Sequence, residues 1–308
     1  MENAVTGALF LGAIAWASYV SHNWAVTIGA GLGVIVATAT AWVISADRPS
    51  IDAGLFGFNG VLVGAALPTF VANSPQLWFY IVIGAAVSTV VTAAFSATLT
   101  RSWGIPGSTG PFVLTAWLMV AGAYAFGGLR VTSAGPALAT EYAQMGLVIP
   151  DLPELCKIFF RNIGQVFLLG DWISGAIILV GIFIASIRAG IATAVASAVA
   201  LLIAIAMGAD PETVRQGLYG FSPVLAGLAV GVIFLQPSFK VALYALLATI
   251  TCVFVQAGFD VIMRPLGLPS FTAPYVLTMY LFIAPRSLFA PHPHTPVEGH
   301  AITKGGES

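Results

Sequence analysis

Long apolar segments follow one another along most of the chain, separated by short clusters of polar, charged, glycine and proline residues. Each apolar segment is close to the roughly 20 residues that a helix needs to cross the hydrocarbon core of a bilayer. We predict ten spanning segments, over residues 4–20, 24–46, 54–71, 76–99, 111–127, 172–188, 190–208, 217–236, 241–259 and 274–290. The short stretches before 111 and 274 are too rich in proline and glycine to be ordinary spans. The pattern predicts an all-α integral membrane protein.

Two motifs recur at one fixed separation, which indicates an internal duplication. Gly54–Phe58 (Gly-Leu-Phe-Gly-Phe) is followed 163 positions later by Gly217–Phe221 (Gly-Leu-Tyr-Gly-Phe). Pro106–Thr115 matches Pro269–Thr278 at the same separation, with the shared pattern Pro-x-x-Thr-x-Pro-Phe/Tyr-Val-Leu-Thr. Two separate motifs with one separation are hard to obtain by chance. The sequence therefore predicts two homologous repeats.

The duplication divides the chain into two units of five predicted spans each. We expect the first repeat in residues 1–128 and the second in residues 157–290. A connector would cover 129–156, and a disordered tail would follow over 291–308. Because five is an odd number of crossings, the second repeat must enter the membrane with the opposite orientation. The predicted fold is thus two inverted repeats of five transmembrane helices, with re-entrant half-helices in addition.

The two proline motifs are the first candidate for a functional path. Two prolines five residues apart cannot both lie inside one continuous helix, whereas proline is favoured in a first helical turn. We expect a half-helix to begin at each motif, buried against protein, with the hydroxyls of Thr109 and Thr272 facing an internal path. One such motif alone would indicate a packing kink, but two at corresponding positions favour a functional role.

A phenylalanine in a glycine-rich segment of each repeat is the second candidate. Phe58 and Leu62 lie one turn apart on a helix face, as do Phe221 and Leu225. The small residues around them allow helix backbones to approach closely in a membrane. A two-fold relation between the repeats would set the two rings opposite each other, in a slot for a flat solute. Ordinary aromatic packing between helices would explain either ring alone.

Composition and charge narrow the possible functions. Only 7% of the residues are charged, against about 25% in soluble domains, so we expect membrane lipid around the chain. Away from their ends the predicted spans carry no ionisable group, whereas proton relays and voltage sensors need one. The net charge of −1 argues against nucleic acid as a partner. The two cysteines have no metal-ligand spacing, and we expect neither cofactor, metal nor enzymatic chemistry.

These elements resemble the urea transporter family, whose members have two homologous halves with five spanning helices and two short re-entrant helices in each. Leu268–Thr272 carries that family's Leu-Pro-x-x-Thr signature, and Ile105–Thr109 departs from it only at the first residue. Gly57–Gly64 looks like its Gly-Tyr/Phe-Asn-Gly-x-Leu-Val-Gly segment. Arg161–Phe167 looks like its first re-entrant helix, with Asn162 in place of glycine. The resemblance covers nearly the whole chain, and we expect a bacterial member.

The resemblance implies facilitated diffusion of urea through a channel at the interface of the two repeats. It implies a pathway that includes a gate polar group beside a valine and is lined by Phe58, Leu62, Thr109, Gln165, Val166, Phe221, Leu225 and Thr272. It also implies a homotrimer with one pore in each protomer. We expect a multi-pass protein of the cell membrane with cytoplasmic termini, although Lys and Arg are divided almost evenly between the two sides.

One element of the resemblance has no counterpart in the first repeat. Only six residues precede Gly7, which corresponds to Gly175, so the first re-entrant helix is missing there. We expect either a translation start further upstream, or a truncated sequence, or one pore mouth of different design.

Alternative functions stay open at this point. A channel for ammonia, water or short amides would use a similar uncharged path. An ion-coupled transporter of small solutes would differ by its dependence on an ion gradient. A membrane enzyme would need a reactive group that the spans lack, and a non-transporting assembly subunit would conduct no solute.

Overall fold

A computed structural model describes residues 3–132, 135–137 and 149–289. Over these residues the chain is helical, and the one β-type contact is an antiparallel bridge between Val71 and Val131. Among the described residues four helices are long and apolar: α2 (Trp24–Val43), α5 (Pro75–Phe95), α10 (Ile187–Ala206) and α13 (Phe239–Met263). Six shorter apolar helices accompany them: α1 (Ala4–Val20), α4 (Leu55–Phe70), α7 (Gly110–Ala123), α9 (Trp172–Ala185), α12 (Phe221–Leu228) and α14 (Ala273–Ile283).

Four short or amphipathic helices connect these elements: α3 (Arg48–Asp52), α6 (Arg101–Trp103), α8 (Leu152–Gly164) and α11 (Pro211–Arg215). Four helices are long and apolar enough to cross a membrane, or five if α8 and α9, which meet at a bend of 74°, form one broken span. Each predicted span contains a helix. The architecture is that of an all-α integral membrane protein, as predicted.

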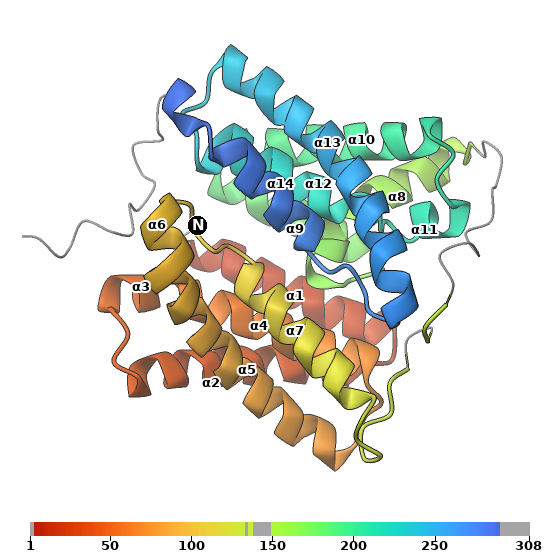
Figure 1. Ribbon diagram of the computed structural model, residues 1–308. Coiled ribbons are helices and arrows are strands. Elements are labelled where there is room, and N and C mark those ends of the chain that lie inside the picture. The colour runs from red at the N-terminus through yellow and green to blue at the C-terminus, as the bar shows by residue number, and fades with distance from the viewer. Residues whose placement is uncertain (1–2, 133–134, 138–148, 290–308) are drawn as a thin grey trace, which may run out of the picture.

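The two halves of the chain form two groups of helices that pack side by side. In Figure 1 helices α1 to α7 lie together below and helices α8 to α14 lie together above. Helices α1 and α9 join the groups through two hydrogen bonds. Thr6 Oγ1 donates to Gly181 O (2.9 Å), and Ser174 Oγ donates to Ala13 O (3.1 Å). Each helix thus supplies one hydroxyl and one carbonyl.

The backbone turns in the same way at corresponding positions of the two halves. Left-handed φ angles occur in pairs that are 163 residues apart, at Ser45 and Gly208, Gly54 and Gly217, Gly104 and Gly267, and Ser108 and Phe271. The repeat boundaries and the inverted orientation of the second repeat stay predictions. The connector over 129–156 is described only in part, and the predicted tail lies outside the described residues.

Several helix boundaries in the second half differ from the prediction; α14, for example, ends at Ile283 rather than at 290. Helix α12 begins at Phe221 rather than at 217. Gly54 and Gly217 have similar φ angles of 75° and 77°, but the side chain of Asn162 packs against Gly220, just before α12. Helix α13 runs to Met263 instead of ending at 259, and its last turn includes Asp260. The Asp260 carboxylate accepts a hydrogen bond from the Gln256 amide at 2.9 Å. This helix therefore carries a carboxylate that the predicted span excluded.

Helices α2 and α4 pack through glycine. A Cβ atom added at Gly33 would overlap the backbone carbonyl of Gly60, and one added at Gly29 would overlap the carbonyl of Gly64. The two backbones are therefore in direct contact, as small residues permit in a membrane. This crossing fixes α4, which carries Phe58 and Leu62.

Substitution of Gly33 by alanine should separate these helices. We expect Gly33→Ala to lower the free energy of unfolding by about 1–3 kcal/mol, as overpacking of a close-packed interior does. Gly31→Ala is the matched control on the same helix, because no described atom lies within 4 Å of a Cβ added there. Thermal unfolding of the two variants in detergent measures the difference, and equal melting temperatures would contradict the direct backbone contact.

Candidate solute pathway at the half-helix contact

Helices α7 and α14 begin at the two proline motifs. Helix α7 starts at Gly110 with Pro111 in its first turn, and α14 starts at Ala273 with Pro274 in its first turn. The prediction that a helix begins within each motif is confirmed. At 1.5 Å per residue these helices are about 21 and 17 Å long, shorter than the ~30 Å hydrocarbon core. The residues before them, 105–109 and 268–272, must complete each crossing.

The N-cap residues of the two half-helices are in contact with each other. Thr272 Oγ1 donates to Thr109 Oγ1 at 2.7 Å, and the two side chains are 3% and 1% exposed. Within the described structure neither hydroxyl caps its own helix. Because the two residues correspond in the sequence repeat, their contact lies where the two halves meet. The structure thus brings together one pair of the predicted pathway residues.

A reciprocal pair of contacts flanks the threonines. Ser108 Oγ lies 2.7 Å from Tyr275 Oη, and at the corresponding positions the rings of Phe271 and Phe112 meet edge to face with centroids 5.2 Å apart. Two-fold relations produce reciprocal contacts of this kind. The Ser108–Tyr275 pair was not predicted. The sequence does hold a sign of this pair. Phe112 corresponds to Tyr275 in the other repeat, and Phe271 corresponds to Ser108, so each phenylalanine has a counterpart with a hydroxyl group.

Asn59 positions the turn that carries Thr109. Its amide donates to Ser108 O at 3.3 Å, and its Oδ1 accepts from the backbone N–H of Phe112 at 3.0 Å. The counterpart of Asn59, Ser222, is buried and its hydroxyl has no partner among the described residues. The first half therefore has a support for its half-helix that the second half lacks.

Side chains of each half also bind backbone carbonyls of the other half. These bonds run from Trp117 Nε1 to Pro269 O (2.9 Å), from Tyr124 Oη to Gly267 O (3.0 Å) and from Arg286 Nη1 to Gly104 O (2.6 Å). They hold the non-helical residues before α7 and α14 against protein.

Phe58 and Phe221 make no ring contact with each other among the described residues. Phe221 is nearly buried as the first residue of α12, whereas Phe58, in the second turn of α4, is 38% exposed. Leu62 is fully buried and Leu225 is partly buried. The predicted slot between the two rings therefore stays a prediction.

Gln165 and Val166 lie at the bend between α8 and α9. They belong to a 3₁₀ turn, Gln165–Phe167, and both are partly buried. Gln165 Nε2 donates to Gln216 O at 2.8 Å. The hydrogen bonds found for the described residues do not link Gln165 to the threonine pair, so its place on the pathway also stays a prediction.

The electrostatics at the threonine pair come from helix ends. The N-terminus of a helix carries a partial positive charge, and the N-termini of α7 and α14 meet at Thr109 and Thr272. In the described part of the chain, no group of three or more His, Cys, Asp or Glu residues could hold a metal ion. The two helix ends give the site a partial positive charge, which attracts hydrogen-bond acceptors and disfavours cations.

Fold and site together define a multi-pass α-helical membrane protein with an uncharged polar contact inside it. Residues 1–287 match the urea transporter family, and the chain belongs to that family. It is similar to urea transporter 1 of Capra hircus, with 27% identity over 292 residues that make up 92% of this chain and 73% of the relative. Urea transporter 1 of Mus musculus is 27% identical over 290 residues, again 92% and 73% of the two chains.

The threonine contact can be tested with a double-mutant cycle. Thr109→Val or Thr272→Val alone leaves the other hydroxyl buried without its partner, and each should lower the free energy of unfolding by about 1–3 kcal/mol. The double variant removes both hydroxyls and should lose less than the sum of the single losses. Denaturant unfolding of the four proteins in detergent measures the coupling, and additive losses would show that the hydroxyls do not interact.

Proposed function

We propose that the protein conducts urea passively across the membrane, through a path at the interface of its two halves. The observation that carries this proposal is the contact between Thr109 and Thr272, where two half-helices meet inside a chain of the urea transporter family. Urea is flat and neutral, with one carbonyl acceptor and four N–H donors. An uncharged polar site inside apolar helices suits such a solute.

The path must replace the hydrogen bonds that urea loses when it leaves water. An unpaired polar group in an apolar environment costs several kcal/mol. The hydroxyls of Thr109 and Thr272, the carbonyls of the non-helical residues before them and the Gln165 side chain would bind the edges of urea. Phe58 and Phe221 would cover its flat faces. Each contact must be weak, because a selective pore has to release its solute quickly.

The two helix N-termini support selection of neutral solutes over cations. Positive ends of half-helices inside a pore raise the energy of a passing cation. Ammonium and Na⁺ would meet this barrier at Thr109 and Thr272, whereas the carbonyl oxygen of urea would be attracted. We therefore propose transport without ion coupling and without a covalent step.

Assembly and location belong to the same proposal. The resemblance to the family leads us to propose a homotrimer in the cell membrane, with one path in each protomer, cytoplasmic termini and inverted repeats. Reciprocal contacts between the halves support the repeat, at Thr6 and Ser174 as well as at the threonine pair. Strongly exposed apolar side chains such as Phe79 and Phe239 support contact with lipid or a neighbouring protomer.

Stopped-flow efflux from proteoliposomes tests the function directly. Purified protein should accelerate urea efflux over protein-free vesicles, and a proton or sodium gradient should not change the rate. Thr272→Val should conduct more slowly, because it keeps the shape and removes an acceptor. If the rate of urea efflux depended on the gradient, the protein would be an ion-coupled transporter rather than a channel. If no solute crossed, the protein would be a non-transporting assembly subunit. Competition by acetamide, thiourea and ammonium separates urea from the other solutes.

The aromatic slot predicts a change of selectivity. Phe221→Leu should raise acetamide permeability relative to urea severalfold, because the flat cover of the path is lost. Phe56→Leu is the matched control, since Phe56 is equally buried on the other half's glycine-rich helix. Both variants should melt at lower temperature, but only Phe221→Leu should change the ratio of the two permeabilities. An unchanged ratio would assign Phe221 to packing alone.

A further inference from the structure

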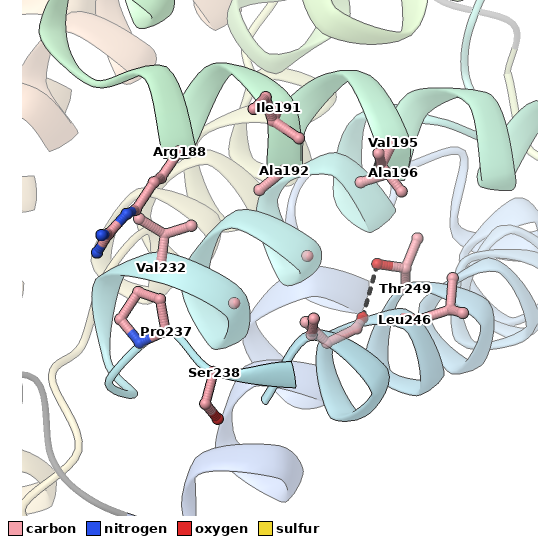
Figure 2. Close-up of a pocket in the computed structure, with 14 residues that line it drawn as sticks. Arg188, Ile191, Ala192, Val195, Ala196, Val232, Pro237, Ser238, Leu246 and Thr249 are labelled. Atoms are coloured by element: carbon pink, nitrogen blue, oxygen red, sulfur yellow. Dashed lines mark hydrogen bonds between the residues drawn. The ribbon is translucent and has the colours of Figure 1, made fainter. Parts of the chain in front are cut away.

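An apolar cavity of about 270 Å³ opens between helices of the second half. It lies between α10, the π-helical turn Ala229–Ile233 that follows α12, and α13. Figure 2 shows Ile191, Ala192 and Val195 along α10, with Arg188 at one end of the cavity and Thr249 at the other. Its lining is almost entirely apolar, and neither Thr109 nor Thr272 contributes to it. The cavity is therefore separate from the proposed solute path.

The amino-acid sequence explains why this space exists beside α10. In the first half, Gly29 and Gly33 of α2 lie against the backbone of α4. Their counterparts are Ala192 and Ala196, which carry methyl groups and line the cavity. A Cβ added at Gly227 would lie 2.8 Å from that of Ala196, so the methyl group of Ala196 stands against the backbone of α12 at Gly227.

A second replacement removes volume at the same place. Pro68 of α4 packs against α2, with its ring 3.2 Å from a Cβ built on Gly29. The counterpart of Pro68 is Gly231, which lines the cavity and has no side chain. The alanine methyl group against Gly227 and the missing proline ring together account for the open space.

The mouth of the cavity is positively charged. Arg188 is exposed, and it has no hydrogen bond or ion pair among the described residues. Helix α13 begins beside it at Ser238, so a positive helix end lies at the same place. Lys240 follows in the first turn of α13, with its ammonium 4.8 Å from the ring centre of Phe289. None of the residues found to line the cavity is acidic.

We propose that the cavity binds one acyl chain of an anionic phospholipid whose phosphate contacts Arg188. Basic side chains at span ends extend to the level of the headgroups, where they attract anionic lipid. An apolar cavity that begins at the headgroup level and extends into the membrane lies beside the acyl chains of the lipids. Ile191 and Val195 are 53% and 51% exposed, so lipid can enter from the side. The first half has no counterpart of this basic side chain, because Ala25 stands where the second half has Arg188.

Lipid retention tests the proposal. The protein is reconstituted with equal amounts of phosphatidylglycerol and phosphatidylcholine, extracted in mild detergent and examined by native mass spectrometry. Wild type should retain one phosphatidylglycerol per protomer in preference to phosphatidylcholine. Arg188→Ala should reduce that preference about fivefold, the effect of one basic residue near a membrane surface. Arg101→Ala, which removes an exposed charge at another helix end, is the matched control and should change nothing.

Two further variants separate the acyl chain from the headgroup. Ala196→Leu should fill the cavity and lower retention of either lipid while Arg188 stays in place. Arg188→Glu does not change the volume of the cavity and should reverse the preference for phosphatidylglycerol over phosphatidylcholine. This variant tests the proposal even if Ala196→Leu fails to fold. Equal retention of both lipids by wild type, or equal losses in Arg101→Ala and Arg188→Ala, would overturn the proposal. The proposal would also be overturned if the cavity retained no lipid and the surface around it formed crosslinks to a second copy of the chain.

Discussion

Lipid offers no hydrogen-bond partner to a peptide group, and this constraint governs the centre of the molecule. Helices α7 and α14 begin part of the way across, so the residues before them expose backbone groups that protein must satisfy. Asn59 does this within the first half, whereas Trp117 and Arg286 bind carbonyls across the two halves. Neither half-helix could be placed in the membrane without its neighbours. The contact of the threonines therefore depends on both halves being folded together.

The two halves share the same backbone turns but differ in the side chains at their helix contacts. Paired left-handed turns occur at the same spacing along the chain. Yet α2 meets α4 through glycine, while α10 carries Ala192 and Ala196 at the corresponding positions and leaves a cavity. Two added methyl groups and the replacement of Pro68 by Gly231 thus accompany the change from a closed helix crossing to an open one. Function can differ between the halves without any change of topology.

Local backbone chemistry made part of the fold predictable. The starts of α7 and α14 follow from proline alone, because its effect on a helix needs no partner. The extent of α13 could not be predicted, since the partly buried Asp260 is held by the amide of Gln256, which also donates to the hydroxyl of Ser270. Ser108 and Tyr275 are 167 residues apart and meet only through docking of the halves. Phe58 and Phe221 match in the sequence repeat, yet one is exposed and lies inside α4 while the other is buried and starts α12.

A hydrogen bond between two equivalent hydroxyls cannot itself be symmetric. Only one of Thr109 and Thr272 can donate its proton to the other, so the pair has two proton orders that differ in which residue keeps a free O–H. Rotation about two C–O bonds exchanges them without moving a heavy atom. The threonine pair can therefore present its spare donor from either half of the chain. The choice between the two proton orders falls to the neighbouring groups, which differ between the halves at Asn59 and Ser222.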